Sequence, residues 1–459
     1  MTTGPMTGAP LSLRALNRAT LHRQLLLHRT ARPAGQAVAH LAGMQSQAPL
    51  APYIGLWTRL AGFRPAHLEN LLTERAVVRA HVMRNTVHLT DARDFIAFRP
   101  LFQPLIDRAL RGSFGRRLAG VDLAAVTRIA SALLAEHPLT RVQIAAGLAP
   151  HWPDHDPASL AYAATHLLPL VQVPPRGLWS QTGPATFFLA SAWLSGDDSP
   201  AGPPDPAAAD PAVADPAAAA PDPAAAAPDP AAAPPDPAAA PPPGEDPGPL
   251  DPAVAVERLV LRYLAAYGPA SVADVQAWSG LSRLREVTER LGGRLRPVAG
   301  PDGAQLLDLP EAPAPDPDVP APPRFLPEYD NLLLSFADRS RVIPHGRPVP
   351  LPPGNGASAG TLLIDGQWQA NWKIIRGEGK SGKSGKSGTS GTGGKSGTGG
   401  KSSTGASGTG GTGQAVVRVE PFVRLGAADR AAIEAEGAGL LAFAAAGADV
   451  RDVQFAPVG

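Results

Sequence analysis

Apolar residues recur at the spacing of helices and strands along much of the chain, beginning close to its N-terminus. Their spacing predicts helices at Leu16–Leu27, Ala37–Gly43 and Ala66–Leu72. At Val82–Leu89 the pattern predicts a strand or a pair of strands. We interpret these elements as the first of three similar units.

A helix-turn-helix followed by a hairpin is clearest between residues 270 and 309. Ser271 can cap a helix that Gly280 closes, because a hydroxyl accepts from free N–H groups and glycine tolerates the left-handed conformation that ends a helix. Ser282 can cap a second helix at Arg283–Leu291. The predicted strands that follow, in the position of a wing, are Leu295–Val298 and Gln305–Leu309.

An earlier copy of this unit begins at Pro138. It has predicted helices at Thr140–Leu148 and around Ser159–Leu168. The predicted hairpin consists of Leu170–Val173 and Gly177–Gln181, with its turn at Pro174-Pro175-Arg176. Three winged-helix-like units therefore fit residues 10–310.

The C-terminal part combines short β patterns with one helix. The helix is predicted at Ala427–Ala444, between Gly426 and Gly447. The predicted strands are Leu332–Phe336, Thr361–Ile364, Asn371–Ile375 and Ala415–Val419. The predicted class is α+β, with winged-helix units at 10–115, 116–195 and 253–312 and a small β domain at 320–459.

Two low-complexity stretches separate these regions. Residues 196–252 repeat a DPAAA-type unit, and its frequent prolines prevent a continuous helix, so we expect a disordered acidic linker. Residues 377–413 are rich in Gly, Ser, Thr and Lys, and we expect a flexible loop joining two neighbouring strands of the β domain.

The near-neutral net charge of +1 is an average over regions of opposite sign. Residues 1–196 hold 19 arginines, no lysine and 9 acidic residues, whereas residues 197–251 hold 11 acidic residues and no basic one. Arginine donates two parallel hydrogen bonds to phosphate, so the N-terminal charge indicates a polyanionic partner such as nucleic acid. The alternative is a compositional bias that scatters arginines over solvated surfaces. The acidic linker is interpreted as a spacer, with mimicry of phosphate as the alternative.

Composition also excludes several kinds of chemistry. The chain has no cysteine, which excludes disulfides, thiol nucleophiles and cysteine-ligated metals. Its first lysine is Lys373, so a lysine Schiff base is not expected. His151 and His155 are four residues apart, but Pro153 between them breaks the helical geometry of a metal pair. With no cofactor, signal peptide or membrane span indicated, a cytoplasmic protein is expected.

The most unusual short segment is Gly43-Met44-Gln45-Ser46-Gln47-Ala48-Pro49, which follows a predicted helix. Pro49 favours extended backbone before it, and in an extended chain residues two apart point to the same side. Gln45 and Gln47 would then face one cleft. The alternative is that both amides cap the helix end or bond to backbone.

Four separated motifs together resemble the winged-helix alkylpurine DNA glycosylases, with the azinomycin-resistance branch of that family as the most similar. They are the segment around Gln45, the segment Val82–Leu89, the segment Tyr329–Arg341 and the ending Val419-Glu420-Pro421-Phe422. The resemblance covers roughly residues 10–195 and 253–459. It implies three tandem winged helices and a β domain in a C shape around duplex DNA.

The resemblance also implies an activity and its residues. The family excises N7-alkylated purines, including interstrand crosslinks, and its Gln-apolar-Gln motif is the catalytic element. That motif maps onto Gln45 and Gln47, with Ser46 where the family usually has an apolar residue. Arg84, Thr86 and His88 in the second motif are candidates for contact with phosphate or the lesion strand, or alternatively have structural roles.

Three further arginines are candidate DNA contacts. Arg176 lies at the predicted hairpin turn of the second unit, and Arg283 and Arg285 lie in the second helix of the third unit. The expected partner is double-stranded DNA, bound by a monomer in the cytoplasm at the nucleoid.

Two other functions fit the same sequence. A winged-helix transcription regulator would place one recognition helix in a major groove, usually as a dimer on a repeated site. A non-catalytic DNA-binding protein would bind alkylated DNA and release no base. Three units in one chain remove the need for a dimer, which argues against the regulator.

Overall fold

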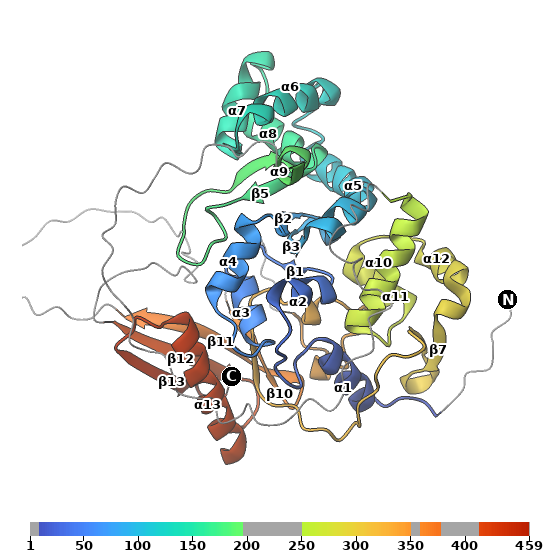
Figure 1. Cartoon of the computed structure of the whole chain (residues 1–459), viewed down its shortest axis with the longest axis vertical. Helices are drawn as coiled ribbons and strands as arrows, with labels where there is room; N and C mark the ends of the chain where they lie inside the picture. Colours follow the sequence, from blue (N-terminus) through green and yellow to red (C-terminus); the bar gives the residue numbers. More distant parts are fainter. Residues whose placement is uncertain (1–8, 196–249, 350–358, 378–412, 459) are drawn as a thin grey trace, which may run out of the picture.

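The computed structural model describes residues 9–195, 250–349, 359–377 and 413–458. It combines helices with a six-stranded, a five-stranded and a two-stranded sheet, which confirms the α+β class (Figure 1). The two low-complexity stretches, including the predicted linker and most of the predicted loop, lie outside the described residues.

The N-terminal region contains the predicted helices with shifted ends and a hairpin at the position of Val82–Leu89. The turn Met83–Asn85 (η1) joins two strands paired from Val77↔Asp91 to His81↔Val87. The remaining elements are α1 (Leu13–Arg23), α2 (Ala34–His40), β1 (Met44–Gln45), α3 (Ala51–Trp57), α4 (Pro65–Thr73), β2 (Val77–His81) and β3 (Val87–Asp91).

A long helix, α5 (Ala92–Phe114), connects this region to the next. Asp91 caps its start by accepting hydrogen bonds from the N–H groups of Arg93 and Asp94. The helix contains Pro100 and Pro104, two residues that oppose a helix interior, and was not predicted. Phe102 and Ile106 on its buried side pack into the largest hydrophobic core.

The second region contains the predicted helix pair but a different hairpin. β5 (Leu170–Val173) is as predicted, whereas its partner is β6 (Thr186–Leu189) and not Gly177–Gln181. Residues 174–185 instead form a long connection, in which the hydroxyl of Tyr53 donates to the Gly177 carbonyl at 2.8 Å. The other elements are α6 (Leu123–Glu136), β4 (Leu139–Thr140), α7 (Arg141–Leu148), η2 (Ala149–His151), α8 (Pro157–Leu167) and α9 (Ala190–Ser195).

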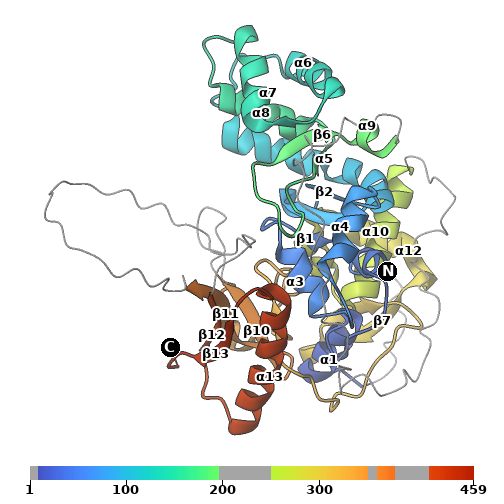
Figure 2. The ribbon, with the colours of Figure 1, turned by 60° about the vertical axis from the view of Figure 1, so that its left-hand side comes forward.

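The first two regions share one sheet. Its strand order is β1-β3-β2-β5-β6-β4, and the pairs Arg79↔Gln172 and Ala80↔Val171 join strands of the two regions. The α6–α8 helices project beyond this sheet at one end of the molecule (Figures 1 and 2).

The third region closely follows its local sequence signals. Ser271 and Asp274 form a reciprocal cap at the start of α11 (Val272–Ser279), and Gly280 ends it with φ 79°. The second helix, α12 (Leu284–Leu291), begins after Arg283 instead of Ser282, because Gln276 of α11 accepts from the Leu284 N–H. The region also contains α10 (Pro252–Tyr267), η3 (Gly292–Arg294), β7 (Arg296–Ala299), η4 (Pro301–Gly303) and β8 (Gln305–Asp308).

The C-terminal region forms a five-stranded sheet covered by α13 (Ala427–Ala444), the predicted helix. The strand predicted at Leu332–Phe336 is wrong, because Asp330 caps the short helix η5 (Asn331–Leu333) there by accepting from the Leu332 N–H. The segment 377–413 does join neighbouring strands, since Gly377 pairs with Gln414. The sheet elements are β9 (Arg324–Leu326), β10 (Gly360–Ile364), β11 (Gln367–Gly377), β12 (Gln414–Pro421) and β13 (Val450–Phe455), with η6 (Pro344–Gly346) before β10.

The largest hydrophobic core holds the first and third regions together. Tyr263 and Tyr267 of α10 pack against Trp278 of α11, with ring centroids 5.1 and 5.9 Å away. Phe336, from the segment after η5, contacts Tyr267 edge to face. The Tyr267 hydroxyl donates to the Leu41 carbonyl at 3.4 Å, across a sequence separation of 226 residues, so the third region meets the first beside α2 and β1.

Candidate active site

The Gln45-Ser46-Gln47 segment leaves α2 through a tight turn and becomes an edge strand. Gly43 has φ 95°, and a side chain there would press on the carbonyl of Leu89 at 3.2 Å, so glycine is needed. Gln45 pairs with His88 of β3, and the Ser46 N–H donates to the Val87 carbonyl at 2.8 Å. The segment is extended, as predicted.

The two glutamines differ in their surroundings. Gln45 is 7% exposed and lines a pocket, whereas Gln47 is half-buried and does not line it. The Gln47 side-chain carbonyl accepts a hydrogen bond from the Val87 N–H at 3.3 Å. For Gln47, the structure therefore agrees with the alternative expectation, in which the side-chain amide bonds to backbone.

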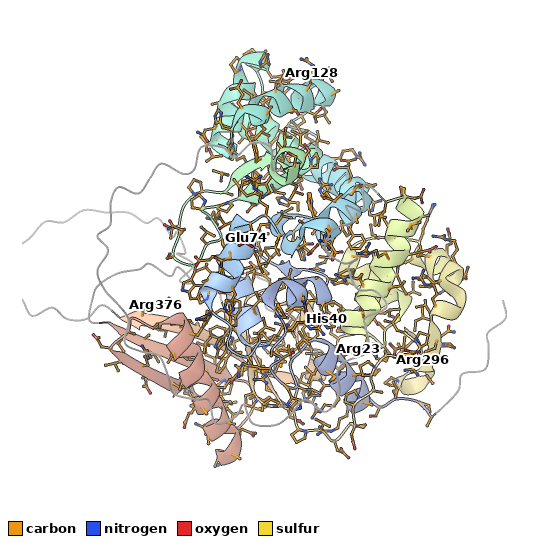
Figure 3. The ribbon with its side chains drawn as sticks, in the orientation of Figure 1. Arg23, His40, Glu74, Arg128, Arg296 and Arg376 are labelled. Carbon is orange, nitrogen blue, oxygen red and sulfur yellow. The ribbon has the colours of Figure 1, made fainter. Side chains whose placement is uncertain are left out.

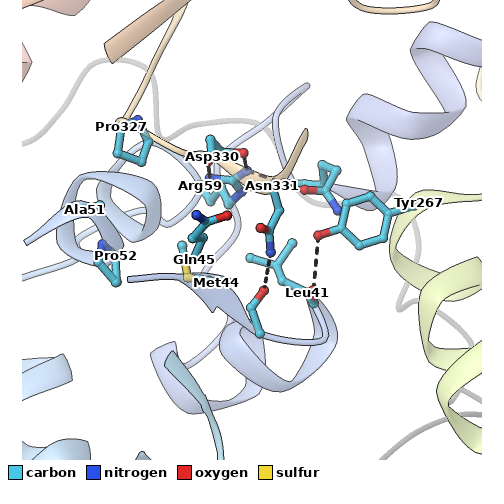
Figure 4. Close-up of a pocket in the computed structure, with 12 residues that line it drawn as sticks. Leu41, Met44, Gln45, Ala51, Pro52, Arg59, Tyr267, Pro327, Asp330 and Asn331 are labelled. Carbon is cyan, nitrogen blue, oxygen red and sulfur yellow. Dashed lines mark hydrogen bonds and ion pairs between the residues drawn. The ribbon is translucent and has the colours of Figure 1, made fainter. Parts of the chain in front are cut away.

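The pocket beside Gln45 is small and lies where the N-terminal, third and C-terminal regions meet (Figure 4). Its walls include Met44 of β1, Pro52 of α3, Tyr267 of α10 and Asn331 of η5. Its empty volume is about 270 Å³, including space open to solvent. Pockets that enclose a drug-sized ligand have about 300–1,000 Å³, so this recess is small by comparison.

A buried ion pair forms one wall of the pocket. Arg59 donates from its two terminal nitrogens to the two carboxylate oxygens of Asp330, each at 3.0 Å. Both side chains are almost completely buried. Arg59 also donates to the backbone carbonyls of Gln24 and Gly55. The bidentate geometry fixes η5 against the N-terminal region.

Arg84 reaches Gln45 from the turn between β2 and β3. One terminal nitrogen donates to the Gln45 side-chain oxygen at 2.9 Å and lies 3.3 Å from the side-chain oxygen of Asn331. The other donates to the backbone carbonyl of Trp278. Burial lowers the pKa of Arg84 to about 10, so it stays charged at neutral pH. Among the described residues, no carboxylate forms an ion pair with Arg84.

Thr86 and His88, the other candidates from that motif, lie beside Arg84. The Thr86 hydroxyl donates to the Met83 carbonyl at 3.2 Å, within the turn. His88 is fully buried, with Nδ1 3.0 Å from the Thr86 carbonyl, so its ring is out of reach of a DNA phosphate in this conformation. Burial, with a contribution from Arg84, lowers the pKa of His88 to about 3.

Ser46 points to the opposite side of the strand, toward Arg79 of β2. Arg79 is fully buried and donates to the Ser46 hydroxyl at 3.0 Å and to the Ser46 carbonyl at 3.1 Å. A further bond of 3.3 Å reaches the Arg176 carbonyl. Burial, with a contribution from Arg176, lowers the pKa of Arg79 to about 9. A hydroxyl at position 46 therefore satisfies a buried guanidinium.

The remaining candidate DNA contacts are at least partly exposed. Arg176 is half-buried and donates to the Gly183 carbonyl within the β5–β6 connection. Arg283 and Arg285 are exposed at the start of α12. They lie in the third region, whereas Gln45 lies in the first.

Much of the N-terminal positive charge is used inside the protein. Arg23 pairs with Asp308 at 2.7 Å, as Arg59 does with Asp330. Figure 3 shows Arg23 close to Arg296, which also contacts Asp308, and places Arg128 and Arg376 at distant edges of the molecule. The buried arginines of residues 1–196 include Arg18, Arg23, Arg59, Arg79 and Arg99. The excess of arginine is therefore only partly a surface property.

Backbone in unfavourable conformations gathers around the pocket. Ala42, Arg84, Asn85 and Tyr329 have φ between 53° and 62°, although none is glycine. Such conformations persist when surrounding contacts hold them and are frequent at functional sites. Four of the nine non-glycine residues with positive φ in the described part of the chain thus lie around this recess, which supports it as the candidate site.

Three polar residues of the site were not predicted as such. Arg59 carried no local signal, and Asp330 and Asn331 belonged to a motif that had been used only for the resemblance. The Asn331 side chain donates to the Gly43 carbonyl at 3.1 Å, across a sequence separation of 288 residues. Only the tertiary structure reveals such a contact.

The polar side chains that line this recess include the amides of Gln45 and Asn331, the Arg59–Asp330 ion pair and the Tyr267 hydroxyl. No group of three metal-binding side chains occurs among the residues that the structure describes. In the same residues, no helix is long and apolar enough to cross a bilayer.

Comparison with known proteins identifies the family. The family model of AlkZ-like DNA glycosylases matches residues 38–443. The solved structure of Streptomyces sahachiroi DNA glycosylase AlkZ shares the fold, with a TM-score of 0.62 and 18% sequence identity over 98% of this chain and 100% of that one. No curated protein matches in sequence. Since the family model spans most of the chain, the protein belongs to the AlkZ-like DNA glycosylase family.

Proposed function

We propose that the protein is a monofunctional DNA glycosylase that excises N7-alkylated purines from duplex DNA and unhooks interstrand crosslinks formed at that position. Gln45 and Gln47 are the proposed catalytic residues. The observation that carries the proposal is the neutral Gln45 amide in a recess between three regions of a chain from a DNA glycosylase family.

The chemistry suits a site built from amides. An N7-alkylated guanine already carries a positive charge, so it departs as a neutral base when it takes the electron pair of the glycosidic bond. The sugar becomes an oxocarbenium ion, water forms the new bond to C1′, and one water proton passes to solvent. The site must position that water and stabilise the sugar cation, which oriented amide dipoles can do without a general acid.

The small size of the recess also agrees with a crosslinked substrate. Most glycosylases flip the target base into a deep pocket, but a base tied covalently to the opposite strand has no freedom to flip. A site too small to take in a flipped base would act on the sugar with the base still in the duplex. We propose three winged-helix units arranged in a C shape around DNA, bound as a monomer at the nucleoid.

Arg176, Arg283 and Arg285 are the proposed contacts to the DNA backbone in this arrangement. Their partial or full exposure leaves them available to phosphate. Each phosphate contact that is lost should lower the affinity and reduce the salt dependence of binding by about one unit of slope. An unchanged salt slope in the Arg283→Ala and Arg285→Ala variants would remove these two from the interface.

The test is release of 7-methylguanine from a defined duplex, with free base measured by chromatography. We expect release by the wild-type protein and a loss of roughly 10²- to 10³-fold when Gln45 and Gln47 are both replaced by alanine, the scale known for removing one preorganised polar group. Gln305→Ala is the matched control, because Gln305 is exposed on β8. Full release by the double variant contradicts the assignment of the two glutamines.

The product distinguishes the remaining alternatives. A monofunctional enzyme leaves an intact strand with an abasic site, so direct strand cleavage by purified protein contradicts that part of the proposal. Tight binding of alkylated duplex without release indicates a non-catalytic DNA-binding protein. Binding to one repeated sequence regardless of alkylation indicates a regulator.

A further inference from the structure

Arg84 is placed to act on Gln45 and on two distant segments at once. Its guanidinium spans the Gln45 side-chain oxygen, the Asn331 side-chain oxygen and the carbonyl of Trp278. Gly280, which ends α11, lies against the backbone of the Arg84 turn, where an added side chain would come within 3.5 Å of it. The turn that carries Arg84 is therefore packed between the motif strand and the third region.

The chemistry of guanidinium fixes which end of the Gln45 amide faces Arg84. Arginine only donates hydrogen bonds, so the atom 2.9 Å away must be the amide oxygen. The amide nitrogen then lies on the other side of the group, and Figure 4 shows the oxygen on the side of Asn331 and the nitrogen opposite. A neutral partner such as serine or water would accept either orientation.

We infer that Arg84 is a positioning residue. It fixes the orientation of the Gln45 amide so that the N–H groups of Gln45 face the recess. This inference deepens the proposed function and rests on it for the role of Gln45. Arg84 holds the carbonyl, which leaves the N–H groups of Gln45 to hold the oxygen of the attacking water. Stabilisation of the sugar cation then falls to other groups of the site, because the positive end of the Gln45 dipole faces the recess. Because Trp278 and Asn331 hold Arg84 in turn, Gln45 is set correctly only when the third region and η5 are docked.

The inference separates Arg84 from an ordinary DNA contact. A phosphate-binding arginine contributes mainly to affinity, whereas a residue that acts through Gln45 contributes to the rate of the bound complex. Its effect also disappears once Gln45 is gone, because interacting residues are not additive.

The first experiment measures single-turnover base release and, separately, affinity for a duplex whose 7-methylguanosine carries a 2′-fluorine that prevents hydrolysis. We expect Arg84→Met to lower the rate roughly 10- to 100-fold, the scale of a misplaced catalytic group, with affinity unchanged. In a Gln45→Ala background the same substitution should change the rate less than about twofold. Additive losses, or weaker binding with an unchanged rate, overturn the inference.

Gln45→Glu tests the role of the N–H groups. Glutamate keeps an oxygen for Arg84 but has no N–H to offer, so we expect a loss as large as that of Gln45→Ala. Activity near the wild-type level in Gln45→Glu overturns the inference. Arg99→Met is the matched control for loss of a buried arginine, because Arg99 lies on α5, donates to the His166 carbonyl and, like Arg84, has its pKa lowered to about 10.

A structural readout keeps the inference independent of activity. In a crystal structure of Arg84→Met, which offers no donor to Gln45, the amide should leave its wild-type orientation, and an unchanged orientation overturns the inference. Arg84→Lys, whose ammonium also only donates, should keep the amide oxygen facing residue 84. If the wild-type protein releases no base, the proposed function fails, yet these structures still decide whether Arg84 orients Gln45. Thermal melting of the same variants against Arg99→Met identifies any general loss of folding.

Discussion

The two faces of the Gln45-Ser46-Gln47 segment are held by different chemistry. On the recess face, Gln45 meets Arg84, and the recess wall is the Arg59–Asp330 ion pair. On the other face, Ser46 meets Arg79, whose hydrogen bonds run to a hydroxyl and to backbone carbonyls. The charged groups are buried on both faces, but only the recess face contains a carboxylate partner.

This difference separates the role of each face. Contacts on the recess face join segments that are 39 to 288 residues apart, so they assemble the site from several regions. Contacts on the opposite face, around Arg79, join the Gln45-Ser46-Gln47 segment to β2 and to the β5–β6 connection. They hold the segment on the side away from the recess. Substitutions on the recess face should therefore affect both the assembly of the site and the rate of base release. Substitutions on the Arg79 face should mainly affect the stability of the fold.

The largest effect is expected from breaking the ion pair with Asp330→Asn. The substitution leaves the buried Arg59 charge without its partner, which costs about 3–5 kcal/mol in comparable pairs. Urea denaturation would measure the loss. Asp318→Asn is the control, since Asp318 is 91% exposed beside Arg14 and its removal should leave the unfolding free energy unchanged. A loss below about 1 kcal/mol for Asp330→Asn would mean that the recess wall does not depend on charge pairing.

A smaller effect is expected on the opposite face from Ser46→Ala. Arg79 loses one neutral acceptor but keeps the carbonyl contacts, and a hydrogen bond to a charged group contributes about 1.5–3 kcal/mol. The same denaturation experiment measures it, with Ser180→Ala at an exposed position as control. We expect base release to fall less than in Gln45→Ala. The reverse result, a normal stability and a large loss of rate, would contradict the division between the two faces.

Local sequence signals predicted the fold well where the structure is also local. α11 begins at the Ser271 cap and ends at Gly280 as predicted, because both signals act within a few residues. The chain does turn at Pro174 and Pro175, but the second strand predicted at Gly177–Gln181 failed, since residues 176–179 instead pack against Tyr53 and Arg79. The strand predicted at Leu332–Phe336 failed for a similar reason, because Asp330 both caps η5 and pairs with Arg59.

The candidate site was predicted in part. The extended backbone of the Gln45-Ser46-Gln47 segment was predicted from the prolines after it, and in an extended strand Ser46 lies on the face opposite to Gln45. Its partners do not, because Arg84, Asn331 and Arg59 come from segments whose proximity depends on packing in the core around α10. The prediction that both glutamines face one cleft also missed the bond between Gln47 and the Val87 backbone.

The smallest effect expected is the contribution of His88, beside the recess, to the pH dependence of the unfolding free energy. Its pKa is lowered to about 3 in the folded protein, against about 6.5 in an unfolded chain. The unfolded state therefore binds the proton first, so this contribution to stability is complete above pH 6.5 and declines as pH falls toward 3. Between pH 7.5 and 5.5 the loss from His88 is about 1.4 kcal/mol. Denaturation of wild type and His88→Gln at both pH values should show a shallower decline in the variant, with His151→Gln, at an exposed position, matching wild type. An equal decline in all three proteins would mean that His88 titrates normally and that the recess face is more open to water than its burial indicates.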